Sequence, residues 1–385
     1  MRAFLDALRL ELRTIRGDAG AVLIAVIGVI AYSLAYPLPY IHQVLREVPI
    51  AVVDADGSSL SRRLTRMADA SELLRTFVVP DLAGAEAAVR AGRAGGVMVI
   101  PRHFERDLLR GGQVTVEAWS DASYFLIYRQ ALTGLTQSIG TLSAGIEIRR
   151  LRAAGLSEAQ ARRFRDPLPL VLRPLWNPAG GYASYVVPGV LMLVLQQTLL
   201  IGIGLLGGTA RERGGDPRLV AARGHGRLLP VLFGRAGAYL LLSAGNALWV
   251  FLVVFHVFRF PQRGEPGVLA LFLLPFLLAI ILLGLTLAHL FRNRETAMQV
   301  LLFTSLPAVF LAGFSWPVEA IPAPLRLLSQ LLPTTPGIAG VLRITQLGVP
   351  LDAVLREWVM LWGLAALYFA LAWGALRRAV RVFDD

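Results

Sequence analysis

The chain has 385 residues, 55% of them hydrophobic, and a formal net charge of +12. Its mean hydropathy of +0.59 indicates a multi-span membrane protein rather than a soluble one. Cysteine is absent, which excludes disulfides, thiolate catalysis and cysteine-ligated metal sites. Every basic residue is Arg, and the missing Lys excludes a Walker A P-loop and Schiff-base chemistry. The Arg residues cluster beside apolar runs, so membrane topology explains them better than nucleic-acid binding.

Residues 1–18 are predicted to form a cytoplasmic amphipathic helix on the inner membrane face. Its apolar stripe consists of Leu5, Leu8, Leu12 and Ile15, and four Arg lie off that stripe. Residues 19–39 follow as the first transmembrane helix, and the Arg before it predict that the N-terminus lies inside. A cleaved signal peptide is the alternative, because 33–35 loosely fits a small-residue cleavage site.

Residues 40–182 have the composition of a soluble α/β domain, placed outside by the topology of the first span. Strands are predicted at 49–54, 74–79, 96–100 and 114–119, with helices between them. This alternation predicts a largely parallel sheet. The helical regions 124–152 and 157–164 are interpreted as a stalk returning to the membrane. Carboxylates at strand ends and turns, Asp54, Asp56 and Asp121, are expected to be structural.

Residues 183–376 are predicted to contain five further transmembrane helices, giving an α-helical integral membrane protein with six spans and an inserted α/β domain. The spans are predicted at 183–206, within 228–258, and at 267–291, 297–312 and 358–376. Arg-rich loops after the second, fourth and sixth spans predict that these loops and the tail, 377–385, are cytoplasmic.

The segment 313–348 breaks the helical pattern before the last span. Gly313 and several Pro interrupt any helix, and two short apolar stretches lie between them. Broken backbone at membrane depth must be buried in protein or line a watery cavity, which predicts a partly inserted hairpin at one membrane face. An amphipathic loop on the membrane surface is the alternative.

This segment resembles the last third of the ABC-2 transporter permeases. The matching residues are Gly313, Phe314, Pro317, Ile321, Pro322, Leu328, Ser329, Leu331, Pro333, Thr335, Arg343 and Ile344. The resemblance extends through VPIAVVDADGSSLSRRL, which begins at residue 48, and covers nearly the whole chain. In the exporter-like branch of that family, the large outer domain likewise lies between the first two spans.

The resemblance implies a permease subunit of a multi-pass efflux transporter in the bacterial cell inner membrane. Two permease chains, as a homodimer or a heterodimer, would pair with a separate ABC ATPase subunit, and a periplasmic adaptor could join them. The direction of transport rests on analogy. The candidate outer gate comprises Gly313, Phe314, Pro317, Pro322, Pro333 and Thr335.

The loop after the second span is the candidate ATPase-coupling loop, because family members carry an acidic, basic and Gly-rich segment there. Its candidate residues are Arg211, Glu212, Arg213, Arg218 and Arg223. Gly214-Gly-Asp-Pro217 departs from the usual family continuation. A loop that only sets topology is the alternative.

Three polar residues in the spans, Gln196, Gln197 and Asn246, are candidates for lining a translocation path. Interhelical hydrogen bonding is the alternative for them. A G-x-G-x-x-G pattern at 202–207 has no preceding strand and is interpreted as a helix-packing surface.

No catalytic motif is present, so no enzyme activity and no cofactor are predicted, and ATP hydrolysis is assigned to a partner chain. Two other function classes stay open: a non-transporting scaffold or receptor whose outer domain binds a partner, and an ion-coupled carrier. The absence of an intramembrane acidic pair argues against the carrier.

Overall fold

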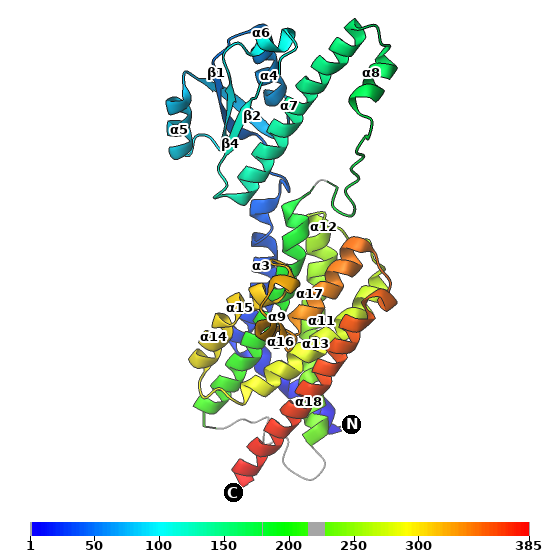
Figure 1. Ribbon diagram of the computed structural model, residues 1–385. Helices are drawn as coiled ribbons and strands as arrows, with labels where there is room; N and C mark the ends of the chain where they lie inside the picture. Colours follow the sequence, from blue (N-terminus) through cyan, green and yellow to red (C-terminus); the bar gives the residue numbers. More distant parts are fainter. Residues whose placement is uncertain (1, 179, 215–227, 385) are drawn as a thin grey trace. The chain divides into compact units, whose positions relative to one another are not determined.

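The computed structural model describes residues 2–178, 180–214 and 228–384. The chain divides into two compact units (Figure 1). The first joins Met1–Gln43 to Pro174–Asp385, and the second is Val44–Arg173. The second unit is therefore an insertion after the first long apolar segment, between boundaries close to residues 40 and 182.

The second unit is built on a four-stranded sheet in the order β2-β1-β3-β4. Its strands are β1 (Val48–Asp54), β2 (Leu74–Val79), β3 (Gly96–Ile100) and β4 (Glu117–Ser120). β1 runs parallel to β2 and β3, whereas β4 is antiparallel to β3. Its helices are α4 (Ser59–Asp69), α5 (Leu82–Arg90), α6 (Phe104–Leu109), α7 (Phe125–Ala153) and α8 (Glu158–Arg165).

Helices cover both faces of this sheet because β1 is apolar on both of its sides. Leu64 of α4 and Leu135 of α7 are buried with Ile50 on one face. Ala85 and Ala88 of α5 cover the other face. Side-chain caps fix where α4 and α5 begin, with Ser58 accepting from the Ser61 amide and Asp81 from the Gly84 amide.

Helix α7 is part of this core and not a free stalk. Its Ala131, Leu135 and Leu142 are buried in the same apolar cluster as β1. Gly134 lies so close to Leu74 that an added Cβ would be 2.5 Å from its Cγ. The sequence pattern did not reveal this, because the apolar positions of α7 are separated by Gly, Ser and Thr.

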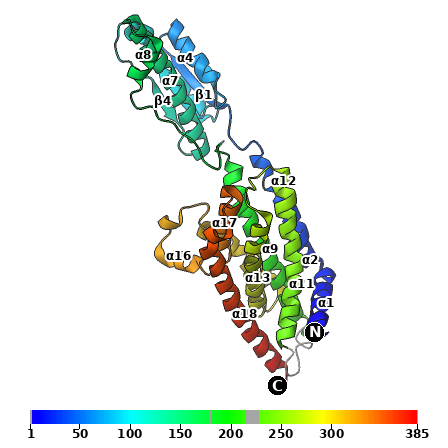
Figure 2. The same ribbon diagram turned by 90° about the vertical axis from the view of Figure 1, so that its right-hand side faces the viewer.

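The first unit is a helical bundle (Figures 1 and 2). It contains α1 (Arg2–Gly17), α2 (Ala19–Val22), α3 (Val29–Ala35), α9 (Tyr182–Glu212), α11 (Leu228–Leu248), α12 (Phe255–Val257), α13 (Pro266–Ala288), α14 (Arg294–Phe303), α15 (Ser305–Leu311), α16 (Ala323–Ser329), α17 (Thr334–Leu342) and α18 (Leu355–Asp384). π-helical turns join α2 to α3 at Leu23–Gly28 and α11 to α12 at Trp249–Val254, and a third, Arg343–Leu347, extends α17.

Five helical segments of the described chain are long and apolar enough to cross a membrane. They are Ala19–Tyr40, Tyr182–Glu212, Leu228–Val257, Pro266–Ala288 and Leu351–Val380. Within the apolar window of α9, 83% of the residues are buried inside the protein, the largest share of the five. α9 is therefore the central helix of this unit.

The span predicted at 297–312 is not one continuous helix. α14 ends at Phe303 and α15 begins at Ser305. Pro307 has no amide hydrogen to donate to the carbonyl of Phe303 four residues earlier, and its ring clashes with that carbonyl. The helix consequently breaks at Thr304, and neither half is long enough to count as a span by itself.

Candidate functional site

The C-terminus of α9 is hydrogen-bonded to the start of α14. A Glu212 carboxylate oxygen accepts a hydrogen bond of 2.8 Å from the Arg294 amide, in the first turn of α14. A negative charge is favourable at this helix end. Arg211 donates to the His289 carbonyl at the end of α13, and Arg213 is exposed. Three helix ends are thereby held together, with one basic side chain left facing outward.

Glycine makes this junction possible. A Cβ on Gly208 would lie 2.4 Å from the Asn293 carbonyl oxygen, and one on Gly207 would lie 2.8 Å from that of Ala288. Gly204 meets Leu301 and Gly202 meets Ala25 in the same way. The interpretation of the 202–207 pattern as a helix-packing surface is confirmed.

Helix α1 packs along the start of α11 around a buried ion pair. Arg235 Nε lies 3.1 Å from a Glu11 carboxylate oxygen, and their side chains are 3% and 0% exposed. The Tyr239 hydroxyl donates to the other Glu11 oxygen at 2.7 Å. Gly234 allows the approach, because a Cβ there would lie 2.5 Å from the Phe4 carbonyl oxygen.

The predicted helix is present, but its buried face is rotated from the expected stripe. Ala7, Glu11 and Ile15 are buried, whereas Leu5 is exposed and Leu8 is only half-buried. The sequence does contain a signal for the pairing of Glu11 with Arg235, because Glu11 lies four residues from both Ala7 and Ile15. An interpretation that places every charged side chain in solvent overlooks this signal.

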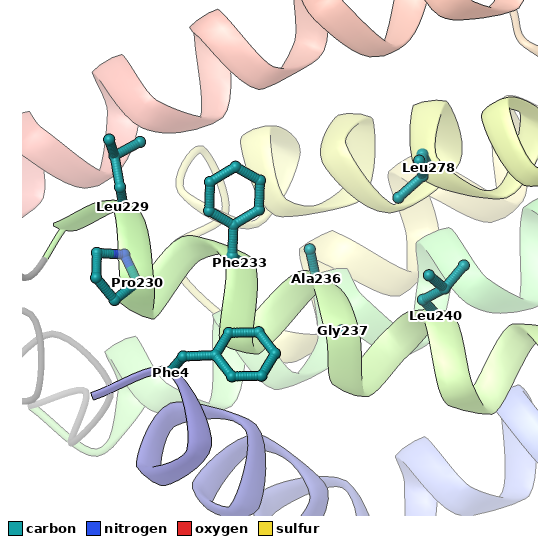
Figure 3. A pocket seen from close by; sticks show the side chains of 8 residues that line it. All are labelled: Phe4, Leu229, Pro230, Phe233, Ala236, Gly237, Leu240 and Leu278. Atoms are coloured by element: carbon teal, nitrogen blue, oxygen red, sulfur yellow. The ribbon is translucent and has the colours of Figure 1, made fainter. Parts of the chain in front are cut away.

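An apolar groove of about 520 Å³ runs beside this contact (Figure 3). It is lined by Phe4, Leu229, Pro230, Phe233, Ala236, Gly237, Leu240 and Leu278. Phe4 reaches from α1 towards α11, and Phe233 points away from α1, where its ring stacks on Phe369 of α18 at 5.5 Å. The groove contains no charged lining residue, so it suits only apolar occupants.

One part of the segment 313–348 is inserted among the helices, as the predicted hairpin would be, and another part lies on the surface, as in the alternative. α17 is buried among α9, α13 and α18, and a Cβ on Gly337 or Gly340 would lie within 2.5 Å of the rings of Phe276 and Phe272 respectively. α16 lies outside the packed helices (Figure 2), and Leu325, Leu327 and Leu328 on it are exposed. Half of the segment is inserted in the bundle, and the other half is an apolar surface helix.

The candidate gate residues fix the turns of this segment. Gly313 has φ of +77°, which favours glycine, and Phe314 packs over Gly189 of α9. The Thr335 hydroxyl donates to the Ser329 carbonyl at 2.7 Å and closes the turn between α16 and α17. Pro317, Pro322 and Pro333 lie immediately before short helical turns, as N-caps.

The candidate path residues make interhelical contacts and are not gathered in one place. The Gln196 amide lies 3.5 Å from the Thr334 hydroxyl at the start of α17. Gln197 donates to the Leu301 carbonyl and to Ser305, bridging to both halves of the broken span. Asn246 donates to the Ala25 carbonyl in the first span at 2.7 Å. Interhelical hydrogen bonding therefore accounts for Gln197 and Asn246.

Gln196 differs from the other two. It is 1% exposed, and its carbonyl oxygen has no hydrogen-bond partner among the residues that the structure describes. Such an oxygen is costly unless a neighbour or a water satisfies it. Among the candidate path residues, only Gln196 has a fully buried side-chain oxygen that lacks a hydrogen-bond partner among the described residues. Two of the candidate coupling residues, Arg218 and Arg223, lie outside the described residues.

Asp54, Asp56 and Asp121 of the second unit make local hydrogen bonds that suit the structural roles expected of them. Asp54 accepts from the amides of Asp56 and Gly57, and Asp121 from that of Ser123. Burial raises the pKa of Asp56, but hydrogen bonds from the Ser58 hydroxyl and from backbone amides at the start of α6 outweigh it and hold that pKa below its usual range. The described part of the chain contains no group of His, Asp and Glu that could hold a metal ion.

Comparison with known proteins gives one family. The family model described as ABC-2 family transporter protein matches residues 20–373. The chain is 26% identical over 380 residues to the inner membrane transport permease YhhJ of Escherichia coli (strain K12), covering 96% of each chain. It is 24% identical over 350 residues to the linearmycin resistance permease protein LnrN of Bacillus subtilis (strain 168), covering 86% of this chain and 88% of the relative.

A third relative matches over a shorter region. This is the probable multidrug ABC transporter permease YbhS of Escherichia coli (strain K12), 24% identical over 249 residues, or 64% of this chain and 63% of the relative.

Proposed function

The chain belongs to the ABC-2 family of transporter proteins, and we propose that it is the permease subunit of an ATP-driven exporter working with a separate ATPase chain. The observation that carries this proposal is the family match, which includes both the bundle and the inserted unit. Similarity to an inner membrane permease over 96% of both chains supports the inner membrane as its location. Two relatives, one named a probable multidrug permease and one a linearmycin resistance permease, support outward transport of a small compound.

The distribution of Arg supports an orientation with both termini in the cytoplasm. The ends of α9, α13 and α14 meet at the same end of the bundle where both chain termini lie (Figures 1 and 2). Arg gather there, on α1, at the end of α9, at 292 and 294, and at 377 and 378 of α18. Positively charged ends stay on the cytoplasmic side. In this orientation the second unit is extracytoplasmic.

We assign one further crossing, the fifth in chain order, to α14 and α15 together. The run Arg294–Leu311 has 18 residues and a helical length of about 27 Å, close to the thickness of the hydrocarbon core. Gln197 holds both halves to α9 through Leu301 and Ser305. The break at Thr304 then gives this crossing a flexible point beside the central helix.

The proposed coupling surface is the junction of α9, α13 and α14. Because Glu212 accepts a hydrogen bond from the first amide of α14, a displacement of this junction moves α9 and the broken crossing together. Arg213 is exposed beside it and is available to an acidic partner surface. Arg218 and Arg223 remain proposed members of the same surface.

The proposed gate is helix α17, which packs among α9, α13 and α18. Its N-terminus faces Gln196 of α9, whose carbonyl oxygen has no partner among the described residues. Movement of α17 away from α9 would uncover this polar group for cargo, with Gly313 and Pro333 as the turning points. Co-purification of a second kind of permease chain would indicate a heterodimer, and its absence a homodimer.

Affinity capture from the native membrane in mild detergent, followed by mass spectrometry, tests the proposal. We expect a P-loop ATPase near a one-to-one ratio. Arg213→Glu should weaken its capture, whereas Glu265→Arg, an exposed charge at the opposite end of α13, should not. Arg213 is exposed, so its replacement leaves the capping hydrogen bond of Glu212 in place.

The same capture, combined with transport assays, discriminates the other two classes. Capture of an outer partner without an ATPase, with efflux unchanged on deletion, would favour a scaffold or receptor. Transport that follows an ion gradient and ignores ATP depletion would favour a carrier. Either result would contradict the exporter proposal, and an adaptor would be recognised as an additional captured chain.

A further inference from the structure

The second unit contains a cavity of about 560 Å³ that no structural role explains. It lies between α4, α6 and α7 and the segment 111–116. Its lining consists of Leu64, Phe104, Leu108, Gly111, Gly112, Gln113, Val114, Val116, Ile139, Leu142, Ser143, Ile146, Glu147 and Arg150. Cavities of this size with an apolar floor and a few polar groups are typical of small-molecule sites.

The cavity exists because the fourth strand begins late. The sequence predicts a strand from Val114, but β4 starts at Glu117. The preceding Gly111, at φ of +90°, turns the chain away from the sheet. Residues 111–116 therefore form a wall that stands off from α7.

The two ends of the lining differ in chemistry. Phe104 and Leu142 are buried and form an apolar floor, continued by the half-buried Ile146. Glu147 and Arg150, one turn apart on α7, are the two charged side chains at the mouth. An occupant must therefore have an apolar body and a charged or polar end.

The two charges are not equally available. The Arg150 guanidinium donates to the Leu108 carbonyl in the last turn of α6, where a cation is favourable, and so ties α6 to α7. Glu147 forms no hydrogen bond and no ion pair with any residue that the structure describes. The uncommitted charge at this mouth is thus negative, beside an apolar floor.

We propose that this cavity binds an organic cation, with its apolar body against Phe104, Leu142 and Ile146 and its ammonium group on Glu147. The conclusion that an organic cation is the cargo rests on the proposed exporter function, which it deepens. The binding itself does not depend on ATP or on a partner chain. The two statements can therefore fail separately.

Dansylcadaverine is a suitable probe, because it carries a primary ammonium group on an apolar, environment-sensitive fluorophore. Full-length protein in lipid nanodiscs is titrated with it at neutral pH, and empty nanodiscs give the background from partition into lipid. We expect saturable binding to the protein. The N-acetylated analogue, which lacks the charge, should bind roughly two- to fivefold more weakly.

Two pairs of variants locate the site. Glu147→Gln should weaken the binding of dansylcadaverine roughly two- to fivefold, whereas Glu117→Gln, which changes an exposed carboxylate outside the cavity, should have no effect. Ser143→Phe should fill the cavity and abolish binding, whereas Gln137→Phe, exposed elsewhere on α7, should not. Circular dichroism and size-exclusion chromatography verify that each variant is folded.

Equal binding by wild type and Glu147→Gln, or by the probe and its acetylated analogue, would overturn the proposal. So would tighter binding of 11-(dansylamino)undecanoate, an anionic amphiphile, that is lost in Arg150→Gln. If an ATPase co-purifies but no saturable cation binding occurs, only the ligand assignment fails. If binding occurs and no ATPase is found, only the exporter function fails.

Discussion

The buried pair between Arg235 and Glu11 allows a quantitative test of how α1 is attached to the bundle. At 3.1 Å and an effective dielectric constant of 20, the attraction is about 5 kcal/mol before desolvation. Removing one partner leaves a buried charge without compensation, which typically costs about 3–5 kcal/mol. We expect Arg235→Leu and Glu11→Gln each to destabilise the protein by that amount. The Gln side chain keeps an acceptor for the Tyr239 hydroxyl.

The double variant separates a stranded charge from lost packing. With neither charge present, it should be more stable than either single variant, with a coupling energy of at least about 2 kcal/mol. The measurement is reversible unfolding by SDS in mixed micelles, followed by loss of helical signal. Matched protein-to-detergent ratios keep the four unfolding free energies comparable.

Additive effects would refute this reasoning. If Arg235→Leu costs less than about 1 kcal/mol, and the double variant loses the sum of the single losses, the two side chains do not interact as a buried pair. The attachment of α1 would then depend on close packing at Gly234 alone.

Three further outcomes are expected. Gly208→Ala places a methyl group against the backbone of Asn293 and should cost about 1–3 kcal/mol in the same unfolding assay, whereas Gly363→Ala, with open space around it, should be neutral or slightly stabilising. Pro307→Ala restores a missing amide and should join α14 to α15, seen as new hydrogen-exchange protection at residue 307. The pKa of Asp56 is lowered in the folded unit, so its contribution to the free energy of unfolding is complete above about pH 4 and is lost as the pH falls through the folded pKa. The wild type should therefore lose more stability than Asp56→Asn over that acid range.

The sequence was most informative where hydrophobic period and capping agreed. The strands that begin near 49, 74 and 96 are observed within one residue of the prediction, with helices between them, and Asp81 caps the helix that follows the second strand. Long apolar helices at 182–212, 228–257 and 266–288 also lie where the predicted spans do. These features depend on local composition, which a single sequence displays directly.

Features that depend on a distant partner were not predictable in the same way. The position of α7 in the core of the second unit depends on the close approach of Gly134 to Leu74 of β2, which lies far from it in sequence. The buried position of Glu11 requires Arg235 on another helix. The break at Thr304 was locally readable from Pro307, but the surrounding apolar run was long enough to suggest one span.

The candidate site shows the same division. The sequence identified Glu212 as the acidic member of the coupling loop, but not that it caps α14. It identified Gln196, Gln197 and Asn246 as polar residues within the spans, but not which of them has a fully buried oxygen without a partner among the described residues. Only the packing of α17 against α9 distinguishes Gln196 from the other two.

Site-specific crosslinking tests the central claim most directly, because the chain has no cysteine and a single introduced one is unique. Arg213→Cys, in native membranes treated with a bifunctional thiol-to-amine reagent, should give an adduct with a P-loop ATPase whose yield changes with ATP. Glu265→Cys, at the opposite end of the bundle, should give none. An ATPase adduct at 265, or no nucleotide-dependent adduct at 213 in cells that transport normally, would contradict the account.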